Sequence, residues 1–148
     1  MMVLRRIAVV LMLLGSVACR QMTVAGNAMS PTLTDGERVK AVLATGSLTR
    51  GDIVALKYPQ DESKMFVQRI IGLPGQRIEM QAGVMFVDGK PIDERYVLEA
   101  NRSFGDWGPR TIPDDEYFVM GNNRRNSSDS RHWGTVRRSL IVAKIDRP

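Results

Sequence analysis

The chain has 148 residues, with a hydrophobic content of 43% and a charged content of 25%. These values fit one globular domain and exclude a wholly disordered, collagen-like or coiled-coil chain. The formal net charge is +5, but the arginines are spread along the sequence and accompany no nucleic-acid-binding motif, so we expect no nucleic-acid partner. The sequence has a single cysteine and a single histidine, which exclude an intrachain disulfide and a Cys/His zinc site. We therefore expect neither a metal nor a cofactor.

The first predicted element is an apolar segment behind a charged start. Arg5 and Arg6 precede an apolar run over 7–18, which is shorter than the roughly 18–20 residues that span a bilayer and suits a signal-peptide core. The two arginines belong on the cytoplasmic side, so everything after about Gln21 faces the other compartment. We divide the chain into residues 1–20, a signal peptide or membrane anchor, and residues 21–148, a β domain.

The residues before Cys19 allow two modes of membrane attachment. The stretch Gly15-Ser-Val-Ala-Cys19 resembles a bacterial lipobox, in which the cysteine is lipidated and becomes the new N-terminus, although Ser16 stands where leucine is usual. In the other mode, residues 7–18 stay in place as a short anchor and Cys19 is incidental. Either mode places the following domain at a membrane surface.

From Arg38 onward the apolar residues come in short runs separated by turn residues, which predicts an all-β domain. The proline and glycines of Leu73-Pro-Gly-Gln76 and of Asp88-Gly89 predict tight turns. The segments Asn101–Arg110 and Asn122–Gly134 are predicted to be surface loops. The predicted strands are Arg38–Leu43, Asp52–Tyr58, Met65–Gly72, Arg77–Gln81, Val84–Asp88, Tyr117–Gly121 and Ser139–Ile145.

Three sequence segments carry chemical information in combination. They are Ala28-Met-Ser-Pro-Thr-Leu33, then Arg50-Gly-Asp-Ile-Val54 leading to Phe66-Val-Gln-Arg-Ile-Ile-Gly-Leu-Pro-Gly75, then Met120-Gly-Asn-Asn-Arg-Arg-Asn-Ser-Ser-Asp-Ser-Arg-His-Trp-Gly134. In this order they resemble bacterial signal peptidase I, from about Asn27 to Ile145. The resemblance implies coiled antiparallel sheets on the outer face of the cytoplasmic membrane, and the signal peptides of exported preproteins as partners.

The resemblance also shows that the family's catalytic dyad is missing. In the family, the first segment begins with a serine that attacks the scissile carbonyl, and a lysine before the arginine of the second segment is the general base. Those positions are Ala28 and Gln68 here. A methyl group is no nucleophile, and an amide is too weak a base to take a hydroxyl proton near neutral pH. The pair of replacements is typical of a naturally inactive relative.

Other positions of the motifs have both functional and structural interpretations. Ser127 matches the serine that orients the family's lysine, and we expect its hydroxyl to hydrogen-bond the Gln68 amide. Met29 and Pro31 are candidate substrate-binding residues, although the segment around Pro31 could simply fix a bend and pack the core. Asn122 and Arg125 replace acidic residues that are usual in the family.

Arg69 and Asp129 are predicted to form a structural ion pair. Ser30 is a candidate replacement nucleophile near Ala28. Ser30 would share a strand face with Ala28 if the backbone were extended, but the motif places no lysine beside it. Lys64 lies ~13 Å from Gln68 along a strand, too far to replace the base.

Three functions remain open. The leading hypothesis is a catalytically inactive signal-peptidase-like protein that binds a signal peptide or another exported segment in its groove. The alternatives are an active signal peptidase with a non-standard nucleophile, and a structural lipoprotein whose groove has no ligand.

Overall fold

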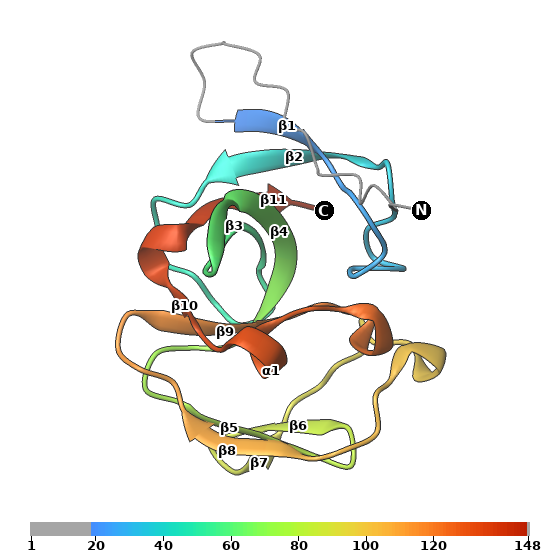
Figure 1. Cartoon of the computed structure of the whole chain (residues 1–148), viewed down its shortest axis with the longest axis vertical. Helices are drawn as coiled ribbons and strands as arrows, with labels where there is room; N and C mark the ends of the chain where they lie inside the picture. The colour runs from blue at the N-terminus through green and yellow to red at the C-terminus, as the bar shows by residue number, and fades with distance from the viewer. Residues whose placement is uncertain (1–18, 148) are drawn as a thin grey trace, which may run out of the picture.

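The computed structural model describes residues 19–147 as two antiparallel β-sheets (Figure 1). The larger sheet has the order β1-β2-β11-β3-β4-β9-β10 and the smaller the order β7-β6-β5-β8. The strands of the larger sheet are β1 (Cys19–Thr23), β2 (Arg38–Leu43), β3 (Ile53–Tyr58), β4 (Asp61–Gly72), β9 (Glu116–Met120), β10 (Val136–Arg137) and β11 (Ile141–Asp146). Those of the smaller sheet are β5 (Arg77–Gln81), β6 (Val84–Val87), β7 (Lys90–Pro91) and β8 (Trp107–Thr111).

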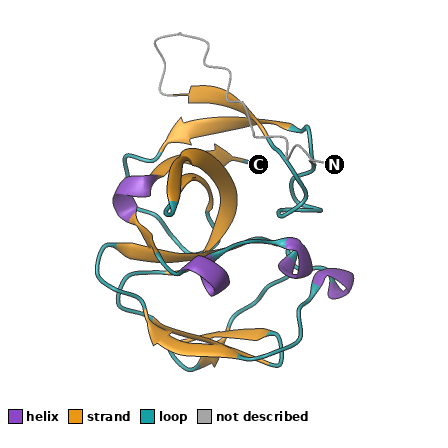
Figure 2. Cartoon of the chain, viewed as in Figure 1, coloured by secondary structure: helices purple, strands orange, loops and turns teal. Residues whose placement is uncertain are grey.

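The all-β prediction is therefore confirmed, and every predicted strand is present with its ends shifted by at most four residues. Figure 2 shows strands through both layers, with only short helical turns at the connections. These are the 3₁₀ turns Glu99–Asn101, Arg124–Asn126 and Arg138–Leu140, and the single α-helical turn α1 (Ser130–Trp133). The predicted turns are also present: the Gln76 amide donates to the Leu73 carbonyl at 3.1 Å, and Asp88-Gly89 joins β6 to β7.

The pattern of apolar residues explains the place of each strand. β2 and β11 alternate buried with more exposed positions, as expected where only one face of a strand is covered. β3 is instead buried at four consecutive residues, Ile53 to Leu56, because it lies between β11 and β4 with apolar clusters on both faces. The second half of the long strand β4 pairs with β9, and the turn after it leads into the smaller sheet.

Four of the observed strands, β1, β8 and the two-residue strands β7 and β10, lie where no strand was predicted, and so do the short helical turns other than Arg138–Leu140. β1 pairs with β2 from Cys19 to Thr23, so the sheet begins two residues before the predicted domain boundary. β8 begins inside the predicted loop Asn101–Arg110 and pairs with β5, and α1 lies inside the predicted loop Asn122–Gly134. β8 was missed because Gly108 and Pro109 interrupt its apolar pattern.

The predicted signal peptide or anchor at residues 7–18 lies outside the described residues. Among residues 19–147, no helix is long and apolar enough to cross a membrane.

Candidate functional site

Ala28 lies in a compact turn between β1 and β2. The Ser30 amide donates to the Asn27 carbonyl at 3.1 Å, and the Leu33 amide donates to the Met29 carbonyl at 3.0 Å. Met29 and Leu33 are buried and anchor the turn in the core beneath β2, β3 and β11. The extended backbone that would have placed Ala28 and Ser30 on one strand face is therefore absent, and that premise of the sequence analysis was wrong.

The turn is docked on the segment that follows β9. The Asn123 amide donates to the Ala28 carbonyl at 2.9 Å, and Asn122 Nδ2 donates to Thr32 Oγ1 at 2.8 Å. A Cβ atom built on Gly121 would lie 2.6 Å from the Ala28 carbonyl oxygen and 2.3 Å from Ser127 Oγ. The chain can pass between Ala28 and Ser127 here only because residue 121 has no side chain.

Gln68 reaches the same segment from β4. Its side chain is 1% exposed, and Nε2 donates to the Ser128 carbonyl at 3.1 Å. Its Oε1 has no hydrogen-bond partner among the described residues. The structure thus brings Ala28, Gln68 and Ser127 to one short segment, residues 121–128, with an unpaired buried acceptor at the position of the family's base.

The expected bond between Ser127 and the Gln68 amide is not formed. Ser127 Oγ accepts instead from the Gly121 amide at 3.2 Å, while the Gln68 amide uses the backbone carbonyl one residue further along. A backbone carbonyl is a strong acceptor held at a fixed position, and sequence reasoning that considers only side chains does not find it.

The predicted ion pair between Arg69 and Asp129 was also wrong. Arg69 donates to Asn122 Oδ1 at 3.0 Å and to the Gly51 carbonyl at 2.7 Å. Asp129 is fully buried and pairs with Arg131, at 2.9 Å from Nε to Oδ1. Asp129 also caps α1 and accepts from the Gly121 amide, so its role is to fix the shape of the segment that holds the site.

A buried polar cluster next to the site was not predicted. Arg124 and Glu94 form an ion pair with side chains only 2% and 4% exposed, and the Tyr96 hydroxyl donates to Glu94 Oε2 at 3.3 Å. The Arg69 guanidinium lies 4.0 Å from the centroid of the Tyr96 ring, a cation–π contact. The pKa of Tyr96 is raised to about 12, mainly by burial and secondly by the nearby Glu94 carboxylate. Burial also lowers the pKa of Arg69. The sequence gives no signal for this cluster because Glu94 and Tyr96 lie outside the motifs.

A shallow hollow of about 60 Å³ opens beside Ala28. It lies between two segments, residues 22–29 and residues 65–67 of β4. The buried Met29 is part of its lining, whereas the exposed Pro31 and the buried Gln68 are not. Substrate binding by Met29 is compatible with this position, and a role for Pro31 has no contact to support it.

The two walls of this hollow have unpaired strand edges. β4 pairs with β3 along 61–69, but β9 covers its other edge only from Arg69 onward. Among residues 19–147, β1 is the terminal strand of its sheet and pairs with β2 alone. Backbone groups at such an edge can accept an added strand, so this part of the described chain can hold an extended peptide.

Comparison with known proteins identifies the family. A family model described as signal peptidase, peptidase S26, matches residues 1–148. The chain belongs to this family. Signal peptidase I P of Bacillus subtilis subsp. natto is 44% identical over 120 residues, which cover 74% of this chain and 64% of that protein. The probable signal peptidase I-2 of Synechocystis is 37% identical over 127 residues, covering 80% of this chain and 57% of that protein.

A solved structure supports the same conclusion for the fold. The crystal structure of a signal peptidase I from Enterococcus faecalis matches with a TM-score of 0.59 and 27% identity, over 69% of this chain and 98% of that one. The predicted signal peptidase I resemblance and its antiparallel fold are thereby confirmed. The chain spans less than two thirds of the length of the curated relatives it matches first.

No alternative dyad is assembled around Ser30 in the described residues. The Ser30 carbonyl accepts from Asn101 Nδ2 at 3.4 Å. Lys64, which precedes Gln68 by four residues in the sequence, pairs with Asp61 at 3.6 Å on an exposed surface. A serine needs an adjacent base to become a nucleophile. Lys64, paired with Asp61 on the exposed surface, does not supply such a base.

Proposed function

We propose that this signal peptidase homologue is catalytically inactive and binds an extended segment of an exported preprotein in the hollow beside Ala28. The observation that carries the proposal is the chemistry of the two dyad positions, a methyl group at Ala28 and a buried amide at Gln68. In a serine protease, loss of the nucleophile alone lowers turnover on the order of 10⁶-fold. The loss of both groups leaves no route to an acyl-enzyme.

The binding half of the proposal rests on what is retained. The turn that carries Ala28 is still anchored by Met29 and still hydrogen-bonded to Asn123. Within the described residues 19–147, the edge of β4 that faces away from β3 is unpaired over residues 61–68. A peptide added as a strand between these walls would gain main-chain hydrogen bonds, and small pockets would select its side chains at alternate positions. The apolar segment at residues 7–18 would keep this domain at the outer face of the cytoplasmic membrane.

Cleavage of a preprotein by the full-length chain tests the catalytic half. We expect no product from the wild type or from Ala28→Ser alone, because a serine without a base is inert, and product from Ala28→Ser combined with Gln68→Lys. Cleavage by the wild type that Ser30→Ala abolishes would establish the non-standard nucleophile instead.

Binding of a labelled synthetic signal peptide, followed by fluorescence anisotropy, tests the other half. Ala25 is exposed and lines the hollow, so Ala25→Arg should block the peptide without disturbing the core. Ala100→Arg adds the same side chain at an exposed site outside the lining and should leave binding unchanged. Absence of binding in the wild type would favour the structural lipoprotein.

A further inference from the structure

A second and larger hollow, with a volume of about 510 Å³, is lined by Ser127 and shares no lining residue with the hollow beside Ala28. It is formed by residues 102–104 and by residues of the segment 124–132, and neither Ala28 nor Gln68 lines it. Its lining contains four arginines and no carboxylate: Arg102, Ser103, Phe104, Arg124, Arg125, Ser127, Arg131 and His132. We call it the arginine pocket.

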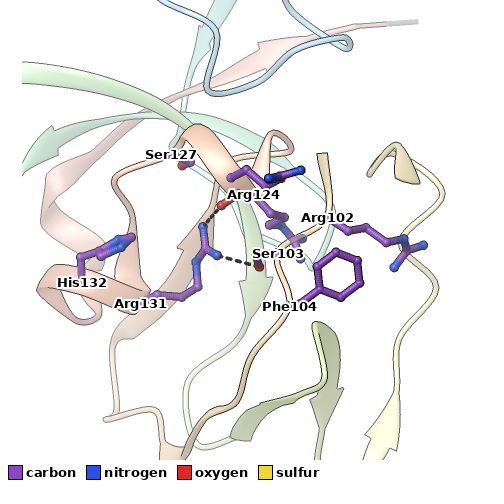
Figure 3. Close-up of a pocket in the computed structure, with 8 residues that line it drawn as sticks. Arg102, Ser103, Phe104, Arg124, Ser127, Arg131 and His132 are labelled. Atoms are coloured by element: carbon purple, nitrogen blue, oxygen red, sulfur yellow. Dashed lines mark hydrogen bonds between the residues drawn. The ribbon is translucent and has the colours of Figure 1, made fainter. Parts of the chain in front are cut away.

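Two of the arginines build the wall of the arginine pocket. Arg124 is buried against Glu94. Arg131 pairs with Asp129 through Nε, donates to Ser103 Oγ at 3.2 Å and donates to the Arg124 carbonyl at 2.9 Å. Figure 3 shows the Arg131 guanidinium reaching between these two acceptors. Both guanidinium groups are held by acceptors of the protein, and Glu94 and Asp129 balance their charges, so these two arginines give the wall a fixed shape.

The other two arginines are available to a ligand. Arg125 is exposed and has neither an ion pair nor a side-chain hydrogen bond within residues 19–147. Arg102 Nε lies 2.8 Å from Glu99 Oε2, but the contact lacks hydrogen-bond alignment, and Glu99 is 83% exposed. Exposed pairs of this kind are weak and screened, so Arg102 can exchange this partner for a ligand.

Two neutral donors complete the arginine pocket. Ser127 Oγ accepts the Gly121 amide, which leaves its hydroxyl hydrogen free to donate. His132 Nδ1 accepts from the Asp129 amide at 3.4 Å, so a neutral imidazole in this arrangement carries its proton on Nε2. Ser127 and His132 belong to the wall formed by residues 124–132, and Arg102 supplies donors from the other wall.

We propose that the arginine pocket binds a phosphate group. Guanidinium groups match the oxygens of a phosphate with paired N–H donors, and donors from several directions suit a tetrahedral anion better than a planar carboxylate. Arg125 supplies the positive charge that has no acidic partner, and Phe104, which is 78% exposed at the rim, can pack against apolar atoms attached to the phosphate. The same chemistry serves a soluble phosphate compound and the headgroup of an anionic lipid.

Titration calorimetry of the full-length chain with inorganic phosphate, at constant ionic strength, tests this site. We expect saturable binding that Arg125→Gln weakens by about tenfold, since a charge-assisted hydrogen bond is lost. Arg102→Gln should weaken it in the same direction. Arg137→Gln removes an equally exposed arginine on β10, outside the pocket, and should have no effect.

Flotation with vesicles distinguishes the two sources of phosphate. Vesicles of phosphatidylglycerol that bind the chain more tightly than phosphatidylcholine vesicles, with the excess lost in Arg125→Gln, would assign the pocket to a lipid headgroup. Equal binding to both vesicles, with phosphate binding intact, would assign it to a soluble compound. The proposal is overturned if phosphate does not bind, if Arg125→Gln and Arg137→Gln behave alike, or if only an acidic peptide binds.

Discussion

Gly121→Ala is the sharpest test of how the site is held together. The added Cβ would lie 2.3 Å from Ser127 Oγ, 2.6 Å from Ser127 Cβ and 2.6 Å from the Ala28 carbonyl oxygen. Ser127 can rotate away from the methyl group, but the Ala28 carbonyl is backbone and accepts from the Asn123 amide. Relief of the clash must therefore separate the Ala28 turn from the segment after β9.

The expected loss of stability follows from these contacts. Overpacking of a close-packed site costs about 1–3 kcal/mol, and a disturbed hydrogen bond at Asn123 or Gly121 adds about 1 kcal/mol. We therefore expect Gly121→Ala to lower the free energy of unfolding by about 2–4 kcal/mol. For a urea slope of about 1–3 kcal/mol per M, which is usual in small domains, the unfolding midpoint should fall by at least about 0.7 M.

Gly46→Ala is the matched control, because its Cβ would meet nothing within 4 Å and Gly46 has no positive φ. It should change stability by less than about 0.5 kcal/mol. Adding Ser127→Gly to Gly121→Ala removes the contacts with Ser127 but leaves the one with Ala28, so rescue should be partial. If Gly121→Ala unfolds at the same urea concentration as Gly46→Ala, the close approach of these segments is refuted.

Three further predictions concern other parts of the chain. Glu94→Gln leaves the buried Arg124 guanidinium uncompensated and should destabilise the fold by about 3–5 kcal/mol in chemical denaturation; a change under 1 kcal/mol would mean that water reaches the pair. An ultraviolet titration should show one tyrosine ionising near pH 12 that is absent in Tyr96→Phe, and because the unfolded phenol ionises at about 10, stability should fall as the pH rises from about 10 through 12. If Cys19 is lipidated, Cys19→Ala should leave an uncleaved precursor without fatty-acid labelling, whereas an anchored chain should keep its mass and membrane location; recovery in the cytosol would contradict both modes.

The sequence predicted the strands well where apolar residues alternate, and less well where tertiary pairing decides. Arg38–Leu43 and Arg77–Gln81 match β2 and β5 residue for residue. β1 and β8 were missed because their residues are mostly polar or conformationally restricted, and only the neighbouring strands β2 and β5 make them strands.

The site was predicted at the level of residues but not of their partners. The motifs predicted that Ala28, Gln68 and Ser127 form one group. In the structure Ser127 belongs to the segment 121–128, and Ala28 and Gln68 both contact that segment. Hydrogen bonds predicted between side chains were replaced by bonds to backbone, as for Gln68 and Ser128. Backbone positions depend on the whole fold, and they cannot be read from residue types in a motif.

The burial of Gln68 links the replacement of the two dyad residues to the stability of the fold. At 1% exposure, a lysine at this position would favour its neutral amine, because burial disfavours the charged form. A neutral amine is what a general base requires, so the same burial would serve catalysis when a hydroxyl is present at position 28 to receive it. With a methyl group at Ala28, that amine would have no hydroxyl at position 28 as a partner, and the cost of burying it would be less well compensated. A neutral amide keeps the bond to Ser128 without a charge. Once the hydroxyl is absent, the buried site therefore favours glutamine over lysine, and the two replacements form one physically coupled change.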